Sequence, residues 1–288
     1  MKAAGLMPAA HLFTHDAMNT TFSLRIREVD EAFARSMARE CCNQLDLLES
    51  HMSRFIEGSE VAQINAMRAG ETLYLSDACH QCLLLALNAR THTGGLFDIT
   101  LGSRIAHRKS GDSGPEPPLA GRLALHPDVP AITCETPGRE IDLGGIAKGF
   151  ALDQLQQLLT AWGAHDALLA AGASSWLALG PSAWPVDLAG DHESIRVHLT
   201  NQALGASGTG IQGNHILHPG GPDAMPARPL TRVWVIAPTA ALAEIWSTAL
   251  MLVSPEEIPD FIAGNPDIAA VYAEHDGHVL PIPPSTTP

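Results

Sequence analysis

The first regular pattern in the chain is an alternation of apolar and polar residues over positions 22–27, which predicts a half-buried strand. Apolar residues then recur at spacings of three and four, which predicts a helix from about Phe33 to Met52. A second helix is predicted from Asp77 to Arg90, with Ser76 as its N-cap. The apolar face of this second helix comprises Cys79, Cys82, Leu83, Ala86 and Leu87.

The second half of the chain predicts three more helices and several strands. One helix follows Gly149 and ends at Gly163, and another runs from about 240 to 253 with Thr239 as its cap. A capping box at residues 254–257, with proline in the first helical position, predicts that a further helix begins there. Strands are predicted at 167–170, 176–179, 195–199 and 233–237, and a hairpin joins 269–273 to 278–282 through Asp276 and Gly277.

The stretch from 103 to 139 is rich in glycine and proline, so we expect mostly loop with short strands. It is either a linker between domains or a set of long loops inside one domain. Helices and strands are mixed along the chain without a steady alternation of strand, helix and strand. The pattern therefore favours the α+β class.

Composition and charge exclude several classes of function and partner. The 288 residues hold 17 Lys and Arg against 31 Asp and Glu, a formal net charge of -14. This balance argues against nucleic acid and anionic lipid as partners, since both require a basic surface. No apolar run approaches the roughly 18 residues that cross a bilayer, so we expect no membrane insertion. Five cysteines and no evident signal peptide favour buried, reduced thiols and a cytoplasmic protein.

Two glycine-rich segments imitate nucleotide-binding motifs. Residues 208–213 satisfy the GxGxxG pattern, but prolines and glycines follow where a dinucleotide fold needs a helix. Residues 144–149 resemble a phosphate loop but lack its Gly-Lys-Ser/Thr ending. Neither segment predicts a Rossmann or Walker A site.

The segment 141–153 nevertheless suits an anion, because it joins a strand end to a helix start through small residues and carries Lys148. Taken alone, it is equally typical of a tight turn with a surface lysine. Glu244 and Thr248 lie four residues apart on one predicted helix face, either in a site or on a solvated surface. His215 and His218 are either metal ligands or polar loop histidines.

Five segments occur together in a characteristic order, at residues 16–22, 53–55, 59–65, 95–100 and 142–149. With them the chain resembles the FAD:protein FMN transferases, the ApbE-like family, from about Met18 to Thr248. The segment Asp142-Leu143-Gly144-Gly145-Ile146-Ala147-Lys148-Gly149 reproduces the family signature unchanged. The resemblance implies one ApbE-like (T-fold-like) domain over residues 16–288, after an N-terminal tail of residues 1–15. This domain would have mixed and antiparallel sheets, flanking helices and long site-forming loops.

The resemblance also implies a reaction: magnesium-dependent transfer of FMN from FAD to a Ser or Thr hydroxyl of an acceptor flavoprotein, with release of AMP. His215 matches the histidine that activates the acceptor hydroxyl. Magnesium would be held by Glu244, Thr248 and the backbone carbonyl of Ala147. The implied FAD-site residues are Met18, Asp98, Gly144, Gly145, Lys148 and Ser207.

The chain departs from the family pattern at four places. Asn19 stands for a glycine, Ser174 for an aspartate, His218 for a second aspartate and Glu244 for the metal-binding aspartate. The longer glutamate changes the reach of a magnesium ligand. Two alternatives therefore stay open: a non-catalytic FAD-binding protein, and a metal-dependent FAD pyrophosphatase that yields FMN and AMP.

Overall fold

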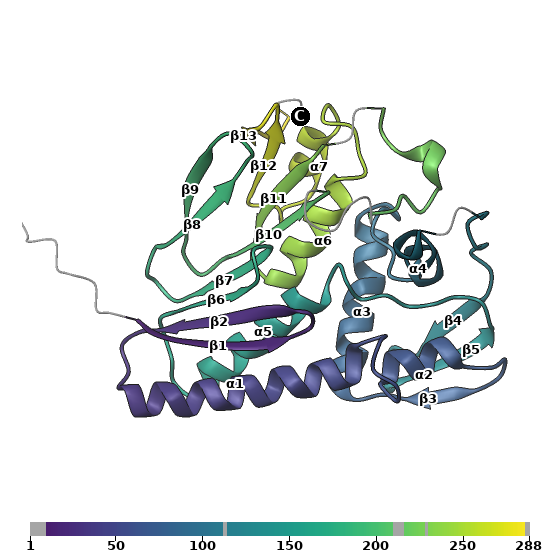
Figure 1. Ribbon diagram of the computed structural model, residues 1–288, viewed down its shortest axis with the longest axis horizontal. Coiled ribbons are helices and arrows are strands. Elements are labelled where there is room, and N and C mark those ends of the chain that lie inside the picture. Colours follow the sequence, from purple (N-terminus) through teal and green to yellow (C-terminus); the bar gives the residue numbers. More distant parts are fainter. Residues whose placement is uncertain (1–9, 112–113, 210–215, 228–229, 286–288) are drawn as a thin grey trace, which may run out of the picture.

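The largest element of the fold is an eight-stranded antiparallel sheet, against which helices and a hairpin pack (Figure 1). The computed structural model describes residues 10–111, 114–209, 216–227 and 230–285. Along the sheet the strands follow the order β1 (His11–Ala17), β2 (Thr20–Ile26), β6 (Ala167–Ala171), β7 (Ser175–Leu179), β10 (Ala203–Gly208), β11 (Arg232–Ala237), β12 (Ala270–His275) and β13 (His278–Ile282).

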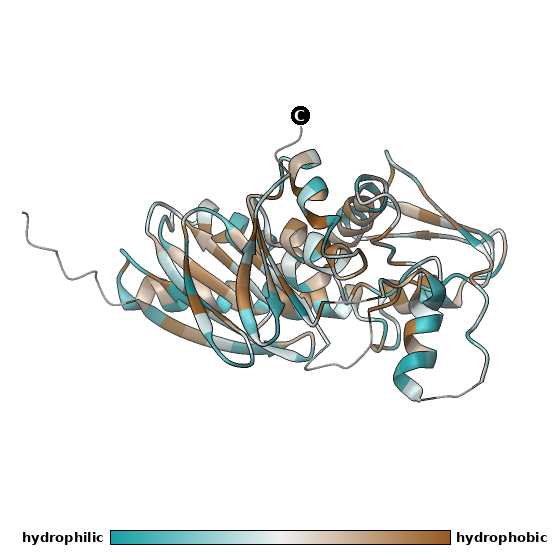
Figure 2. Cartoon of the chain, turned by 90° about the horizontal axis from the view of Figure 1, so that it is seen from above, coloured by the Kyte–Doolittle hydropathy of each residue, from teal (hydrophilic) through white to brown (hydrophobic). Residues whose placement is uncertain are grey.

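Both faces of the central strands are buried. Successive side chains of a strand point to opposite faces, so in β6 Leu169 joins one apolar cluster and Leu168 another. In β11, likewise, Val235 packs in the apolar cluster on one face of the sheet and Trp234 in the cluster on the other. These strands therefore appear in the sequence as continuous apolar runs rather than as alternating ones. Hydrophobic residues concentrate on the strands and on the helices that lie against them (Figure 2).

Helices cover one face of the sheet. They are α1 (Glu31–Met52), α5 (Ala147–Ala161), α6 (Ala240–Leu250) and α7 (Ile258–Gly264). Two glycines set how closely α6 packs. A Cβ on Gly149 would lie 2.4 Å from the carbonyl oxygen of Ala240, and one on Gly205 would lie 2.4 Å from the carbonyl carbon of Ala243. Only glycine allows α6 to lie this close to both α5 and β10.

A two-stranded hairpin covers the opposite face. It consists of β8 (Trp184–Ala189) and β9 (Ser194–Leu199), which pair antiparallel. The buried residues of β8 alternate with exposed ones, and they include Trp184 and Leu188. These side chains pack on Leu168, Leu204 and Trp234 of the large sheet. The molecule is thus layered as helices, large sheet and hairpin.

A smaller three-stranded sheet lies at the other end of the molecule (Figure 1). Its strands are β3 (Thr72–Tyr74), β5 (Ala131–Thr136) and β4 (Arg122–Leu125), and its neighbours are α2 (Glu60–Ala66), α3 (Asp77–His92) and α4 (Gly102–Ser110). A short 3-10 helix, η1 (Pro222–Ala224), precedes β11. The fold is a single α+β domain with antiparallel sheets, as the resemblance implies.

Most of the predicted elements are confirmed. The strand at 22–27 corresponds to β2, and the helices expected from Phe33 and Asp77 correspond to α1 and α3. The side chains of Ser76 and Thr239 accept the capping hydrogen bonds expected of them. The hairpin between β12 and β13 turns at Asp276 and Gly277, both at positive φ.

Several boundaries and faces differ from the predictions. The helix expected after Gly149 begins at Ala147, inside the signature segment. The fifth helix, α7, begins at Ile258 because residues 255–257 form a turn, although Glu257 accepts the expected hydrogen bond from the Ser254 backbone at 3.0 Å. Phe33 and Trp162 are 40% and 41% exposed and stack on each other rather than filling the core.

Other elements escaped prediction altogether. Strand β8 contains Pro185, which is tolerated because this strand belongs only to a two-stranded hairpin. Strand β10 contains Gly205, Ser207 and Gly208, which indicated a polar loop. Helix α2 is seven residues long, too short to show a period. Residues 11–15, expected in the tail, form most of β1 and pair with β2.

The stretch from 103 to 139 is not the mostly irregular segment we expected. It opens with α4, whose only buried residue is Gly102, so no apolar period marks it in the sequence. The short strands expected there are present as β4 and β5, and β5 pairs with β3. Because Ile132 of β5 lies in the main apolar cluster, this stretch is part of the domain and not a linker. Among the described helices, none is long and apolar enough to cross a bilayer.

Candidate active site

The signature segment 142–149 leads directly into the N-terminus of α5. Ile146 is the N-cap residue, and no side chain caps this helix end. The Asp142 carboxylate accepts a hydrogen bond from the Gly144 backbone N–H at 2.8 Å, which shapes the turn. A helix N-terminus of this kind presents unpaired backbone N–H groups and a positive partial charge.

Two side chains, one from the segment after α1 and one from α2, hold the signature segment in place. Arg54 donates to Asp142 at 3.2 Å and to Glu140 at 2.7 Å. The Asn65 amide donates to the Ile141 carbonyl at 3.0 Å and accepts from its N–H at 2.7 Å. The turn is therefore fixed by the protein itself, before any ligand binds.

Lys148 lies on the first turn of α5 and pairs with Glu244 of α6, at 3.2 Å between Nζ and Oε1. The same Oε1 accepts a hydrogen bond from the hydroxyl of Ser175, the first residue of β7. Glu244 is only 4% exposed, and its second oxygen, Oε2, is buried without a hydrogen-bond partner among the described residues. One half of this carboxylate is thus doubly satisfied and the other half is left without a donor.

Three hydroxyl groups lie together one helical turn further along α6. Ser207 of β10 is 2.9 Å from the Ser247 hydroxyl and 3.1 Å from the Thr248 hydroxyl. Gly145 of the signature segment lies beside them, since a Cβ there would come within 3.6 Å of the Thr248 hydroxyl and 3.1 Å of the Phe97 ring. Thus Gly145 lies beside Thr248, the α6 residue predicted as a metal ligand.

Asp153 lies on α5, five residues after Lys148, and caps the start of α6. Its two carboxylate oxygens accept from the backbone N–H groups of Ala240 and Ala241, at 2.8 and 2.9 Å. The pKa of Asp153 is raised to about 6, chiefly by burial and in smaller part by the nearby Glu244 charge, although the two N–H donors act to lower it. The glycine contact between Gly149 and Ala240 and this cap together lock α5 to α6.

The cluster suits a hard divalent cation. Magnesium prefers oxygen ligands and commonly uses one or two carboxylates together with other oxygens and water. Glu244 offers an unpartnered buried oxygen, and Thr248 a hydroxyl on the same helix face. No group of three or more His, Cys, Asp and Glu side chains in the described residues is arranged to hold a metal. The donors that are present, the Glu244 carboxylate and the Thr248 hydroxyl, are oxygen atoms, the kind of ligand that magnesium prefers.

Two further predicted FAD-site residues, Asp98 and Met18, form their described hydrogen bonds with residues outside this cluster. The Asp98 carboxylate accepts from the Thr100 backbone N–H and hydroxyl, at 2.8 and 2.7 Å, and from Arg90 of α3 at 3.2 Å, so both of its oxygens already have protein donors. Met18 lies in the β1–β2 turn at positive φ, and its backbone N–H donates to Glu49 at 2.8 Å. No described contact joins either side chain to Lys148.

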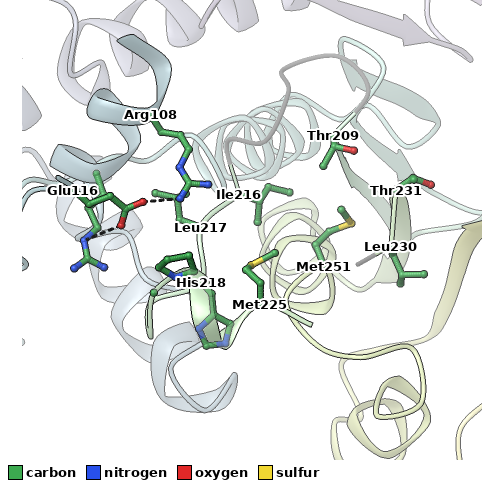
Figure 3. Close-up of a pocket in the computed structure, with 13 residues that line it drawn as sticks. Arg108, Glu116, Thr209, Ile216, Leu217, His218, Met225, Leu230, Thr231 and Met251 are labelled. Atoms are coloured by element: carbon green, nitrogen blue, oxygen red, sulfur yellow. Dashed lines mark hydrogen bonds and ion pairs between the residues drawn. The ribbon is translucent and has the colours of Figure 1, made fainter. Parts of the chain in front are cut away.

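His215, predicted to activate the acceptor hydroxyl, lies outside the described residues. His218 is described, and its ring Nδ1 accepts a hydrogen bond from the Gly220 backbone N–H at 3.0 Å. It lines a cavity of about 260 Å³ between α4 and the segment before β11 (Figure 3). The residues that line the cavity include Thr209, which follows Ser207 by two positions in the chain, and Met251, which follows Thr248 by three.

The cavity wall on the α4 side is charged. Arg108 donates to Glu116 at 2.6 Å, and Arg104 lies 3.8 Å from the same carboxylate (Figure 3). The Arg108 hydrogen bond holds the pKa of Glu116 below its usual range. The opposite wall is apolar and includes Met225, Leu230 and Met251.

Sequence reasoning missed three residues that shape the cluster: Ser175, Ser247 and Asp153. Asp153 lies within the segment 141–153 that we singled out, so its spacing from Lys148 was a usable signal. Ser175 carries no such signal, because it approaches Glu244 across 69 residues of sequence.

Comparison with solved structures identifies the fold. The apo flavinyl transferase ApbE of Pseudomonas stutzeri matches with a TM-score of 0.81 and 21% identity, covering 97% of this chain and 96% of that one. The flavin transferase ApbE of Vibrio cholerae matches with a TM-score of 0.78 and 18% identity, covering 97% and 98%. The architecture described above is therefore that of the ApbE flavin transferases.

Sequence comparison then gives the family. The model of the ApbE family matches residues 18–272, and the chain belongs to this family of transferase enzymes. A Rhodobacter capsulatus protein named FAD:protein FMN transferase is 28% identical over 255 residues, which are 78% of this chain and 48% of that protein. The chain thus matches about half the length of that relative. A Salmonella typhimurium protein of the same name is 23% identical, covering 88% of this chain and 82% of its own length.

Proposed function

We propose that this chain transfers FMN from FAD to a Ser or Thr hydroxyl of an acceptor flavoprotein and releases AMP. The observation that carries the proposal is the meeting of two features at one point. The uncapped N-terminus of α5 brings Lys148 to Glu244, a buried carboxylate with one oxygen unpartnered. Such a place suits a pyrophosphate together with a divalent cation.

FAD is an anion and the chain carries a net charge of -14, so the dinucleotide must be bound by local groups that attract negative charge. Backbone N–H groups at the start of α5 face anions favourably, and Gly144 and Gly145 let a phosphate approach the backbone closely. Lys148 adds a positive charge on the first turn of the same helix. Ser207, whose hydroxyl lies in the neighbouring cluster, offers a further hydrogen bond.

In the transfer step the acceptor hydroxyl oxygen forms a bond to the phosphorus of the FMN half. The bond between that phosphorus and the bridging oxygen breaks, and AMP leaves with this oxygen. His215 takes the proton of the acceptor hydroxyl as general base. Met18 and Asp98 belong to the FAD site in this proposal.

Glu244, Thr248 and the carbonyl of Ala147 would hold magnesium. When bound, the cation offsets negative charge on the pyrophosphate oxygens and on the leaving AMP. Asp153 and Gly149 hold α5 against α6. The chain itself therefore sets the position of Ala147 on α5 relative to Glu244 and Thr248 on α6.

The test combines purified protein, FAD, Mg²⁺ and extract proteins from the source cell lacking this chain. We expect one or more acceptors to carry flavin fluorescence on a denaturing gel, with AMP appearing in equal amount. Tight FAD binding without any labelled acceptor would contradict transfer and leave an FAD-binding protein. AMP release in the absence of any acceptor would instead indicate the pyrophosphatase.

His215 provides the sharpest variant. We expect His215→Ala to abolish transfer while FAD binding, followed by flavin fluorescence quenching, stays largely intact. His198→Ala is the matched control, since His198 is an exposed histidine on β9. Transfer at the normal rate by His215→Ala would remove this residue from the role of base.

A further inference from the structure

Ser175 is a buried hydroxyl that the proposed reaction does not yet use. It is the first residue of β7, is fully buried, and lies opposite Gly205 of β10 in the antiparallel register. At Gly205 helix α6 packs tightly on the sheet, since a Cβ there would lie 2.6 Å from the Glu244 backbone nitrogen. Ser175 is therefore placed directly beneath Glu244 by the sheet itself.

The Ser175 hydroxyl acts as a donor. An ionised carboxylate only accepts hydrogen bonds, so the short contact between Ser175 and Glu244 Oε1 places the hydroxyl hydrogen on that line. Lys148 donates to the same oxygen at 3.2 Å. Two donors from different elements, β7 and α5, thus converge on Oε1, while Oε2 has no partner in the described part of the chain.

A buried oxygen left without a donor costs free energy, and native proteins seldom retain one without a reason. A glutamate also has more rotatable bonds than an aspartate, and fixing them costs side-chain entropy. With Oε1 held from two sides, the rotation of the carboxylate is fixed, and Oε2 is kept free of protein donors. The hydrogen bond from Ser175 supplies part of this fixation.

We propose that Ser175 is a positioning residue: its hydroxyl pins Oε1 of Glu244 so that Oε2 is presented to a divalent cation. The inference rests on the proposed function, because it assigns a role within the same cation site. It also gives the glutamate at this position a physical basis, since the longer side chain reaches the hydroxyl of β7.

The test measures cation binding directly, with no turnover required. Mn²⁺, which is paramagnetic and shares the preference of Mg²⁺ for oxygen ligands, is titrated into the full chain and its free fraction is followed by electron paramagnetic resonance. We expect Ser175→Ala to weaken Mn²⁺ binding by about tenfold, as is usual when a residue that orients a metal ligand is removed.

Ser174→Ala is the matched control. Ser174 is the neighbouring serine, and its only described side-chain contact is the Ser175 hydroxyl at 3.3 Å. We expect Mn²⁺ affinity within about twofold of the parent chain, because the Ser175 to Glu244 bond is left in place. Equal weakening by both variants would overturn the proposal, since it would show a general effect of the β6–β7 turn.

A double-mutant cycle separates positioning from a merely structural role. In Glu244→Asp the carboxylate is one methylene shorter and withdraws from β7, so Ser175 has no oxygen to hold. We expect Ser175→Ala to weaken Mn²⁺ binding about tenfold in the parent chain and less than twofold in the Glu244→Asp background. The same tenfold loss in both backgrounds would overturn the proposal.

The outcomes distinguish this inference from the proposed function. If Ser175→Ala weakens Mn²⁺ binding as expected but the parent chain labels no acceptor, the inference stands and transfer fails. If acceptors are labelled while Ser175→Ala binds Mn²⁺ as tightly as the parent chain, transfer stands and the inference fails. Should Ser175→Ala not fold, judged by its thermal melting, Ser175→Cys keeps the size with a weaker donor, and we expect an intermediate loss of affinity.

Discussion

Two buried carboxylates in different layers of the molecule are satisfied to different degrees. Asp166, just before β6, is 2% exposed and accepts from Trp184 Nε1 at 2.9 Å and from the Ser182 hydroxyl at 2.6 Å, one bond on each oxygen. Glu244, on α6, is 4% exposed and has both its donors on a single oxygen. Asp166 contacts the hairpin β8–β9 through Trp184, whereas Glu244 lies between α6 and the large sheet, where it contacts Ser175 of β7.

The difference separates a structural carboxylate from one that is available to a ligand. Around Asp166 every oxygen is used, and Arg27 lies 4.0 Å away, over the ring of Trp184. Glu274 follows the same rule, since its oxygens accept from the Asp191 backbone at 2.6 Å and from Thr231 at 3.3 Å. Glu244 breaks the rule at the place where the signature segment meets α6.

The largest effect is expected from removing the charge of Glu244. In Glu244→Gln the amide cannot supply an anionic oxygen to a cation, so the rate of FMN transfer should fall on the order of a thousandfold. Stability should change by less than about 1 kcal/mol, since the amide oxygen of glutamine can still accept from Ser175 and Lys148. Flavin fluorescence of the acceptor and urea unfolding measure the two effects, and transfer at an undiminished rate would contradict the assignment.

The complementary change is Asp166→Ala. It leaves the Trp184 N–H and the Ser182 hydroxyl without acceptors and removes the charge nearest Arg27. We expect the free energy of unfolding to fall by about 3 kcal/mol, while the folded fraction still transfers FMN. A urea midpoint equal to that of the parent chain would show that satisfaction of this carboxylate does not stabilise the fold.

Asp153 predicts a pH dependence that is linked to Glu244. Its pKa in the fold, about 6, lies above the ordinary value of 3.8, so between these values the folded state binds more protons than the unfolded state. The free energy of unfolding contributed by this group therefore falls as pH rises from 4 to 6, by about 2 kcal/mol, and is level above that range. Subtracting the curve of Asp153→Asn from that of the parent chain isolates it.

Asp187 supplies a control of opposite sign. The Arg196 hydrogen bond holds the pKa of Asp187 below its usual range, so the contribution of Asp187 to stability is lost as pH falls.

Glu244→Gln should shift the part of the stability-against-pH curve that belongs to Asp153 to lower pH, because the Glu244 charge helps to raise the pKa of Asp153. A curve unaffected by this change would show that the two carboxylates are not coupled.

The smallest effect concerns the thiols. Burial raises the pKa of Cys41 to about 12 and raises those of Cys79 and Cys82 as well, with the Glu244 charge adding to the effect at Cys82. Four of the five cysteines are buried, and Cys42 is partly exposed. We expect iodoacetamide at pH 8 to label the folded chain slowly and at Cys42 first, as peptide mass spectrometry would show. Rapid labelling of all five thiols would contradict this.

Much of the fold was predictable because its signals are local. Alternation in β2, the three-and-four spacing in α1 and the capping serine of α3 all depend on residues within one element. Elements without a local apolar period escaped: α4 buries only Gly102, and β10 looks like a polar loop until β7 and β11 pair with it. Their positions come from contacts that a single segment does not encode.

The same division runs through the site. Lys148, Gly144 and Gly145 were predictable because a strand, a glycine turn and a helix start lie within one continuous stretch. The Ser175 contact was not predictable, and neither was the inward turn of the Asp98 carboxylate toward Thr100 and Arg90. These depend on the register of the large sheet and on how closely α6 packs on Gly205.

By itself, the sequence determined the α+β class, the family resemblance and the segment that suits a phosphate, because each follows from the order of neighbouring residues. Only the tertiary structure decided that Glu244 is buried, that Lys148 and Ser175 share one of its oxygens, and that the other is left without a donor. The physical reason is that burial and hydrogen bonding belong to pairs of residues, and folding joins pairs that lie far apart in the chain.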